Sequence, residues 1–236
     1  MNKYGKIFML PTGLGGSNNN MVIPSGVTEI IRKTNFFAVE NLRTARRFLK
    51  IIDRNIIIDN LSFFELSSET SLEELQKILV SVIEGNNLGV ISEAGCPGIA
   101  DPGSNLVNLA HSKGIEIVPF VGPSSILLAL ISSGLNGQNF SFNGYLPVKN
   151  PGRIAKLLEL EKKVFKENQT QLFMETPYRN NGLLSDVLTN CNSALKLCIA
   201  ADITMESEFI FTKSIAEWKK NVPDLHKRPT IFAIGK

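Results

Sequence analysis

The sequence predicts an α/β protein of two lobes, a mostly parallel βα lobe over residues 1–120 and an α/β lobe with a mixed sheet over residues 121–236. Residues 88–120 have the pattern of a strand, a loop, a helix and a second strand, which is the repeating unit of a parallel sheet. After residue 170, strand patterns follow one another without long crossovers, which favours antiparallel pairing. With 236 residues, the chain is long enough to bury a core in each lobe.

The composition is that of a soluble globular protein, with 43% hydrophobic and 20% charged residues. A net charge of +3 permits an anionic partner without requiring one. The three cysteines, Cys96, Cys191 and Cys198, lack zinc-site spacing, and their odd number argues against a disulfide framework, so we expect a cytoplasmic protein. Because no apolar run is long enough to cross a bilayer and no secretory signal follows Met1, no membrane association is expected.

The chain begins with a predicted buried strand at residues 6–10, KIFML, followed by the loop PTGLGG at residues 11–16. Glycines in such a loop allow backbone N–H groups to approach a ligand closely. The loop lacks both the G-x-x-x-x-G-K-[ST] and the G-x-G-x-x-G patterns, which disfavours a nucleotide P-loop and a dinucleotide site. A generic turn explains these residues equally well.

Helical periodicity predicts two helices before the central strand. In the first, residues 41–52, an apolar stripe lies opposite a cationic face made of Arg43, Arg46, Arg47 and Lys50. These cations either hold RNA phosphates or form an ordinary solvated surface. The second helix, residues 71–85, begins with a capping box, ends at Gly85 and needs no function to explain it.

Residues 88–103 form the stretch around which the chain is organised. The apolar residues 88–91 predict a buried strand, and the loop SEAGCPGIADPG that follows contains three glycines and two prolines. Bare backbone held in a stiff path at a strand end suits a bound cofactor. Asp101 or Ser104 is expected to cap the next helix, which Gly114 ends.

A second loop of the same kind follows the strand at residues 115–120. Residues 122–125, GPSS, lead into a helix at residues 126–132 that is apolar nearly all round, and such a helix is normally buried. Its first turn offers unpaired N–H groups and two hydroxyls to a carboxylate or another polar group. Two loops competent for ligand binding therefore lie one crossover apart.

The second lobe is predicted to contain helices at residues 153–166 and 214–220 and strands at residues 170–174, 195–203, 208–213 and 230–234. Met174 ends the first of these strands, where a core role explains a methionine equally well. His111 and His226 have no cysteine or carboxylate at ligand spacing, so no metal site is predicted.

Several short motifs accompany the central loop. SEAGCPGIADPG and the GPS of residues 122–124 correspond to the patterns S-D-A-G-T-P-x-I-x-D-P-G and P-x-P-G-P-S, and GYLP at residues 144–147 corresponds to G-F-L-P. Weaker matches are Pro11-Thr12 with Leu14-Gly15, Glu40 and Arg43 in an A-E-D-T-R pattern, and ETPYR at residues 175–179 in place of E-S-P-H-R. In these motifs and their order the chain resembles a short member of the ribosomal-RNA branch of the tetrapyrrole methylase superfamily.

The resemblance implies a two-lobed tetrapyrrole-methylase-like fold with S-adenosyl-L-methionine bound in the cleft between the lobes and S-adenosyl-L-homocysteine as product. It also implies a homodimer, and a loop at residues 17–20 that faces the substrate cleft. The residues expected to bind the cofactor are Leu14, Glu93, Gly95, Cys96, Pro97, Ser124, Ser125, Met174, Ala201, Pro229 and Thr230.

The activity implied by the resemblance is methylation of a ribose 2′-hydroxyl in small-subunit ribosomal RNA, so ribosomal RNA or the small ribosomal subunit is the expected partner. Displacement at a sulfonium needs alignment more than a nucleophile or a metal. The carboxylates nearest the motif loops, Glu93, Asp101 and Glu175, are candidates for the general base, although Asp101 as a helix cap and Glu93 as a turn residue are equally well explained. The residues expected to bind substrate are Arg43, Arg46, Arg47, Tyr178 and Arg179.

Two alternatives remain open from the sequence. The first is a methyltransferase acting on a tetrapyrrole or another small molecule, because Asn41 and Tyr178 stand where the RNA branch usually has Asp and His. Against it, corrin and porphyrin methylases usually carry a G-D-P loop where this chain has Ser92-Glu93-Ala94. The second is a non-catalytic paralogue that binds the cofactor, although a purely structural domain has little physical need for the glycines and prolines of the central loop.

Overall fold

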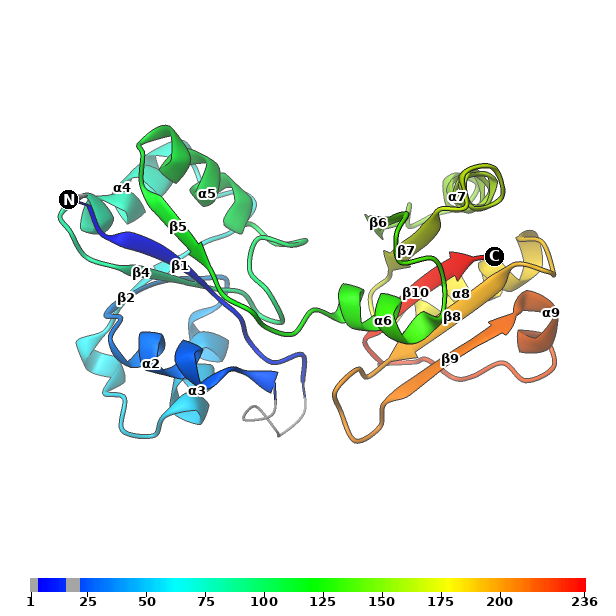
Figure 1. Cartoon of the computed structure of the whole chain (residues 1–236), viewed down its shortest axis with the longest axis horizontal. Helices are drawn as coiled ribbons and strands as arrows, with labels where there is room; N and C mark the ends of the chain where they lie inside the picture. Colours follow the sequence, from blue (N-terminus) through cyan, green and yellow to red (C-terminus); the bar gives the residue numbers. More distant parts are fainter. Residues whose placement is uncertain (1–3, 16–21) are drawn as a thin grey trace. The chain divides into compact units, whose positions relative to one another are not determined.

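The structure, a computed structural model, describes residues 4–15 and 22–236, and the chain divides into two units, Met1–Ser124 and Ser125–Lys236 (Figure 1). The division falls four residues beyond the expected position at residue 120. Residues 17–20, expected at the substrate cleft, lie outside the described residues.

The first unit contains a five-stranded sheet in the order β3-β2-β4-β1-β5, and every neighbouring pair is parallel. Because all its strands are parallel, their carboxyl ends lie at one edge, where the loops after β1, β2, β4 and β5 begin. The strands are β1 Lys6–Leu10, β2 Phe36–Val39, β3 Ser62–Glu65, β4 Leu88–Ile91 and β5 Glu116–Pro119.

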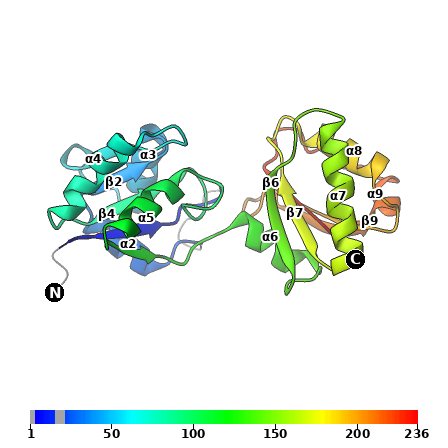
Figure 2. The ribbon, with the colours of Figure 1, turned by 90° about the horizontal axis from the view of Figure 1, so that it is seen from above.

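Helices cover both faces of this sheet (Figures 1 and 2). Along β1, Ile7 and Met9 pack in the core under α4 and α5, whereas Phe8 and Leu10 pack in the core under α2 and α3. Gly89 in β4 has no room for a side chain, because a Cβ atom there would lie 2.7 Å from Leu10 Cδ1. The helices are α2 Ser25–Arg32, α3 Leu42–Ile52, α4 Leu72–Ile83 and α5 Gly103–Ser112, and a 3₁₀ turn η1 spans Ile58–Asn60.

The starts of α3 and α4 follow from local sequence. The Asn41 side chain accepts hydrogen bonds from the N–H groups of Arg43 and Thr44 and thereby caps α3. Ser71 and Glu74 form the predicted capping box at the start of α4. Asn41 therefore has a structural role that an aspartate would also fill.

The second unit contains a mixed sheet in the order β6-β7-β10-β8-β9, in which β6 and β7 are parallel and the other pairs are antiparallel. This confirms the predicted mixed sheet. The strands are β6 Phe140–Tyr145, β7 Thr170–Met174, β8 Lys196–Ala201, β9 Phe209–Ser214 and β10 Thr230–Gly235, and the helices are α6 Ser125–Ser133, α7 Gly152–Glu167, α8 Asn180–Asn190 and α9 Ile215–Trp218.

The main core of the second unit lies between its sheet and the helices α7, α8 and α9. Phe173 of β7 and Phe232 of β10 stack in this core with their ring centroids 5.8 Å apart. The helix α6 packs on β8, β9 and β10. Its prediction as a buried helix is wrong, because the side chains of Leu127 and Ile131 are 48% and 78% exposed.

Among the elements of the described residues, the helices α2 and α8, the strands β2, β3 and β6 and the turn η1 were not predicted. The strands β2 and β3 have four residues each and are too short to show a period. Within the described part of the chain, no helix is both long enough and apolar enough to cross a membrane.

Candidate functional site

Three loops of the first unit meet at the carboxyl edge of its sheet, after β1, β4 and β5. The N–H of Thr12, after β1, donates to the carbonyl oxygen of Gly95, after β4, at 2.9 Å. Gly122, after β5, packs so closely on the ring of Pro11 that a Cβ atom on it would overlap that ring. The loops that the sequence singled out are therefore joined into one surface.

Gly95 lies at the centre of this surface. Its φ of +77° is in the left-handed region that favours glycine, and an added Cβ atom would lie 3.2 Å from both Leu14 Cδ2 and the carbonyl oxygen of Pro123. The thiol of Cys96 donates to the same Pro123 oxygen at 3.4 Å, and burial raises the pKa of this thiol. The four residues fix the path of the central loop.

Asp101 holds the far end of that loop. Its Oδ1 atom accepts hydrogen bonds from the N–H groups of Gly98 and Gly103 at 2.6 and 2.9 Å. It therefore provides an acceptor for the backbone N–H of Gly103, the first residue of α5. Its Oδ2 atom is buried and has no partner among the described residues. An unsatisfied buried acceptor costs about 1–3 kcal/mol, which a bound donor would offset.

Glu40, at the end of β2, joins the site although it was not among the predicted site residues. Its Oε2 atom accepts a hydrogen bond from the N–H of Glu93 at 2.8 Å, and the Thr44 hydroxyl donates to Glu93 Oε1 at 3.4 Å. Burial raises the pKa of Glu40, and the negative charges of Asp101 and Glu93 raise it further. The hydrogen bond from the N–H of Glu93 lowers the pKa but does not cancel these effects. The A-E-D-T-R match named Glu40 in the sequence, but its place beside Glu93 depends on the strand β2, which the sequence did not reveal.

A cavity of about 320 Å³ lies beside these carboxylates, between α3 and the loops after β1 and β4. Of the predicted site residues, Glu93 and Arg47 line it. The described residues that line it are Thr12, Gly13, Gly15, Thr44, Ala45, Arg47, Phe48, Ile51, Ile91, Ser92 and Glu93.

The predicted substrate cations of α3 separate in space. Arg47 lines the cavity, whereas Arg46 lies over the ring of Phe63, with its guanidinium carbon 5.4 Å from the ring centroid. Lys50 donates to the carbonyl oxygen of Arg54 at 3.0 Å. Arg43 is exposed and is not part of the cavity lining. The four cations therefore do not act on one spot.

In the second unit, four residues predicted to bind the cofactor come together at one end of the sheet. Met174 of β7 is paired with Ile231 of β10, and Ala201 of β8 is paired with Thr230. Pro229 directly precedes Thr230, and its carbonyl oxygen accepts a hydrogen bond from Asp202 N–H at 2.9 Å. Strands remote in sequence thus bring these residues side by side.

A buried ion pair that the sequence did not reveal supports this end of the sheet. Arg228 Nε donates to Asp202 Oδ2 at 2.7 Å, and the side chains are 26% and 8% exposed. The Ser207 hydroxyl donates to the same oxygen at 3.0 Å. The pair ties the chain just before Pro229 to the residue that follows β8.

Glu175, a predicted base, is engaged by its neighbours. Its side chain is 1% exposed, and Oε1 accepts hydrogen bonds from Arg179 Nη2 and from Thr176 N–H at 2.6 and 2.7 Å. Burial raises the pKa of Glu175, but these hydrogen bonds outweigh it and the pKa is lowered. Tyr178 is 70% exposed and meets the ring of His226 edge-on. The geometry favours a structural role for Glu175.

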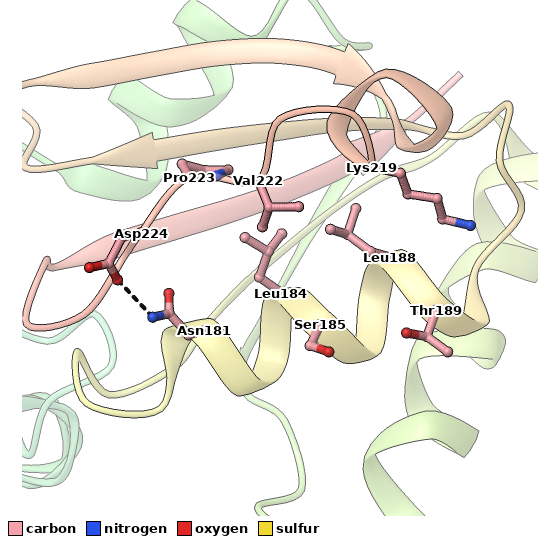
Figure 3. Close-up of a pocket in the computed structure, with 9 residues that line it drawn as sticks. All are labelled: Asn181, Leu184, Ser185, Leu188, Thr189, Lys219, Val222, Pro223 and Asp224. Atoms are coloured by element: carbon pink, nitrogen blue, oxygen red, sulfur yellow. Dashed lines mark hydrogen bonds between the residues drawn. The ribbon is translucent and has the colours of Figure 1, made fainter.

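A larger cavity of about 680 Å³ lies elsewhere in the second unit, between α8 and residues 219–224 (Figure 3). Leu184 and Leu188 of α8 face Val222 across it, and Asn181 Nδ2 donates to Asp224 Oδ1 at 2.7 Å at one end. None of the predicted site residues lines this cavity.

Similarity to solved structures defines the class of the fold. The methyltransferase CobJ matches 98% of this chain and 94% of its own, with a TM-score of 0.64 and 16% identity. The uroporphyrin-III-C-methyltransferase from Thermus thermophilus matches 98% of this chain and 92% of its own, with a TM-score of 0.56 and 15% identity. The fold is therefore the predicted one, that of the tetrapyrrole methylases.

Sequence comparison finds relatives within one group of methyltransferases. Two of these relatives are named ribosomal RNA small subunit methyltransferase I. The protein from Vibrio cholerae is 29% identical over 211 residues, which cover 89% of this chain and 69% of the relative. The protein from Escherichia coli O157:H7 is 27% identical over 236 residues, which cover 99% of this chain and 78% of the relative. No family model matches the sequence. The chain therefore has the fold of the tetrapyrrole methylases, and the relatives to which it is similar in sequence are named for the branch that the central motif resembles.

Proposed function

We propose that this protein is an S-adenosyl-L-methionine-dependent methyltransferase that methylates a ribose 2′-hydroxyl of small-subunit ribosomal RNA. The observation that carries the proposal is the sequence similarity to proteins named ribosomal RNA small subunit methyltransferase I, which extends over 99% of the chain and therefore includes both units. The small-molecule alternative has no comparable support, because the matches to uroporphyrin methyltransferases are at 13–15% identity and bear on the fold alone.

The residues present suit the cofactor. In the first unit, the bare Cα of Gly95 lies in a cradle with Leu14 and Pro123, and Asp101 Oδ2 is a buried acceptor that lacks a donor among the described residues. In the second unit, Met174, Ala201 and Thr230 lie together at one end of the sheet, and Met174 is partly exposed there. The other residues proposed to bind the cofactor are Glu93, Cys96, Pro97, Ser124, Ser125 and Pro229. When bound, the cofactor would supply a methyl group already activated by the sulfonium.

Transfer to a hydroxyl requires that the ribose oxygen lose its proton as it gains the methyl group. Among the carboxylates predicted for this task, Glu93 is the one that lines the cavity, whereas Asp101 holds backbone N–H groups and Glu175 holds Arg179. We assign proton acceptance to Glu93. Glu40 fixes it through the hydrogen bond to its N–H.

Calorimetric titration with S-adenosyl-L-homocysteine and methyl transfer from labelled cofactor test this function. We expect cofactor binding, and label in the RNA of small ribosomal subunits that lack the modification, recovered as a 2′-O-methyl nucleoside. A porphyrinoid panel serves as the control. Label in a porphyrinoid and none in the subunits would overturn the RNA assignment, and cofactor binding with no acceptor at all would favour the non-catalytic paralogue.

We further propose that the protein acts in the cytoplasm as a homodimer. Exposed apolar side chains on α6, notably Ile131, support the dimer, because a second copy would remove them from water. Light scattering at micromolar concentration is expected to give twice the chain mass of 26.0 kDa. A mass of one chain at that concentration would contradict the dimer.

A further inference from the structure

We propose that the cavity beside α3 holds a single unstacked nucleotide of the acceptor RNA, with its base against the helix and its ribose against the loops after β1 and β4. This rests on the proposed function. The volume of about 320 Å³ is near the lower end of the roughly 300–1,000 Å³ range of small-molecule pockets. Such a cavity has room for one nucleotide and is too small to enclose a macrocycle of four pyrrole rings.

The helix side of the cavity is apolar. Phe48 and Ile51, one turn apart on α3, line it together with Ala45, and Ile91 at the end of β4 completes this wall. Bases extruded from RNA are typically held by stacking on aromatic side chains, and each stacked base contributes about 1–3 kcal/mol. The wall therefore suits the face of a base.

The opposite side of the cavity is polar. Thr12, Ser92 and Glu93 line it, and their hydroxyl and carboxylate groups match the hydroxyls of a ribose. Thr12 and Ser92 both make long hydrogen bonds to the carbonyl oxygen of Gly95, at 3.5 and 3.4 Å. The polar wall is thus continuous with the loop proposed to bind the cofactor, so a ribose hydroxyl placed here faces the donor side.

Arg47 provides the charge that the backbone of a nucleotide requires. It is exposed, lines the cavity and has no ion-pair partner within residues 4–15 and 22–236. A guanidinium binds phosphate oxygens in a bidentate manner. Arg46, the preceding residue, lies over the ring of Phe63 and outside the cavity. It is therefore a matched control of equal charge on the same helix.

The test fills the cavity without disturbing the core. Ile51 is 52% exposed, so Ile51→Trp places an indole in the cavity at little cost to folding. Ile57→Trp, at a position that is 61% exposed and outside the cavity, is the control. We expect Ile51→Trp to lower methyl transfer into small subunits by about tenfold or more, with unchanged affinity for S-adenosyl-L-homocysteine, and Ile57→Trp to match the parent. Equal transfer by both variants would overturn the proposal.

The charge is tested by measuring RNA affinity over a range of salt concentrations. Arg47→Gln is expected to weaken RNA binding and to lower the slope of log affinity against log salt by about 1, whereas Arg46→Gln has a smaller effect. Equal effects of the two variants would show that α3 attracts RNA only through its overall charge, which would contradict a phosphate site at the cavity.

A binding measurement separates this inference from the proposed function. Nuclear magnetic resonance titration with each nucleoside 5′-monophosphate should shift the amide signals of Thr44 and Ser92 in the parent and not in Ile51→Trp. Inorganic phosphate alone should leave them in place. If the parent methylates subunits but nucleotides leave these signals unmoved, the cavity assignment fails; if nucleotides shift them but no acceptor is methylated, the proposed function fails and the cavity assignment stands.

Discussion

Gly95→Val is expected to lower the affinity for S-adenosyl-L-homocysteine by about tenfold or more. The residue has a φ of +77°, a conformation that costs a side chain about 1–3 kcal/mol, and the new Cβ would press on Leu14 and on the carbonyl oxygen of Pro123 at 3.2 Å. The loop must move away from both, and both belong to the surface proposed to bind the cofactor. Calorimetric titration measures the loss.

Gly114→Val is the control that separates the effect of backbone strain from the effect of a side chain at the proposed cofactor site. Gly114 also has a positive φ, +69°, but a Cβ atom there meets nothing within 4 Å, and the residue follows α5 at the other end of the sheet. We expect both variants to lower the unfolding temperature and only Gly95→Val to lose the cofactor. Parent-like affinity in Gly95→Val would remove the central loop from the site.

Arg228→Met is expected to destabilise the second unit by up to about 3 kcal/mol, because it leaves the buried carboxylate of Asp202 without its partly buried ion-pair partner. Asp202 is 8% exposed, and Arg228 also donates to the carbonyl oxygen of Ser207 at 2.6 Å. Trp218, the one tryptophan of the chain, is buried in the second unit, so its fluorescence in a urea titration reports on the unit that contains Arg228.

Lys156→Met is the control for a surface pair in the same unit. Lys156 pairs with Glu159 on α7 at 2.9 Å, with side chains 32% and 49% exposed, and such pairs contribute about 0–1 kcal/mol. We also expect Arg228→Met to weaken S-adenosyl-L-homocysteine binding, since Arg228 precedes Pro229. Equal urea midpoints for the two variants would show that the Asp202 pair contributes no more than a surface contact.

Local pattern was sufficient where an element carries its own signals. The capping box of Ser71 and Glu74 and the apolar run of β4 were both predicted correctly, because caps and buried strands depend on neighbouring residues. The prediction failed for α6, since an apolar helix has no single face and its period does not say how much of it is covered.

The sequence by itself determined the α/β class of both lobes, the central loop with its glycines and the resemblance to one branch of a superfamily, because these depend on local patterns and short contiguous motifs. Only the tertiary structure decided that β4 lies between β2 and β1, and this order places Glu40 against Glu93. It also decided that Arg47 lines the cavity while Arg46 lies over Phe63. Such contacts join residues tens of positions apart, and strand order, which no local period encodes, brings them together.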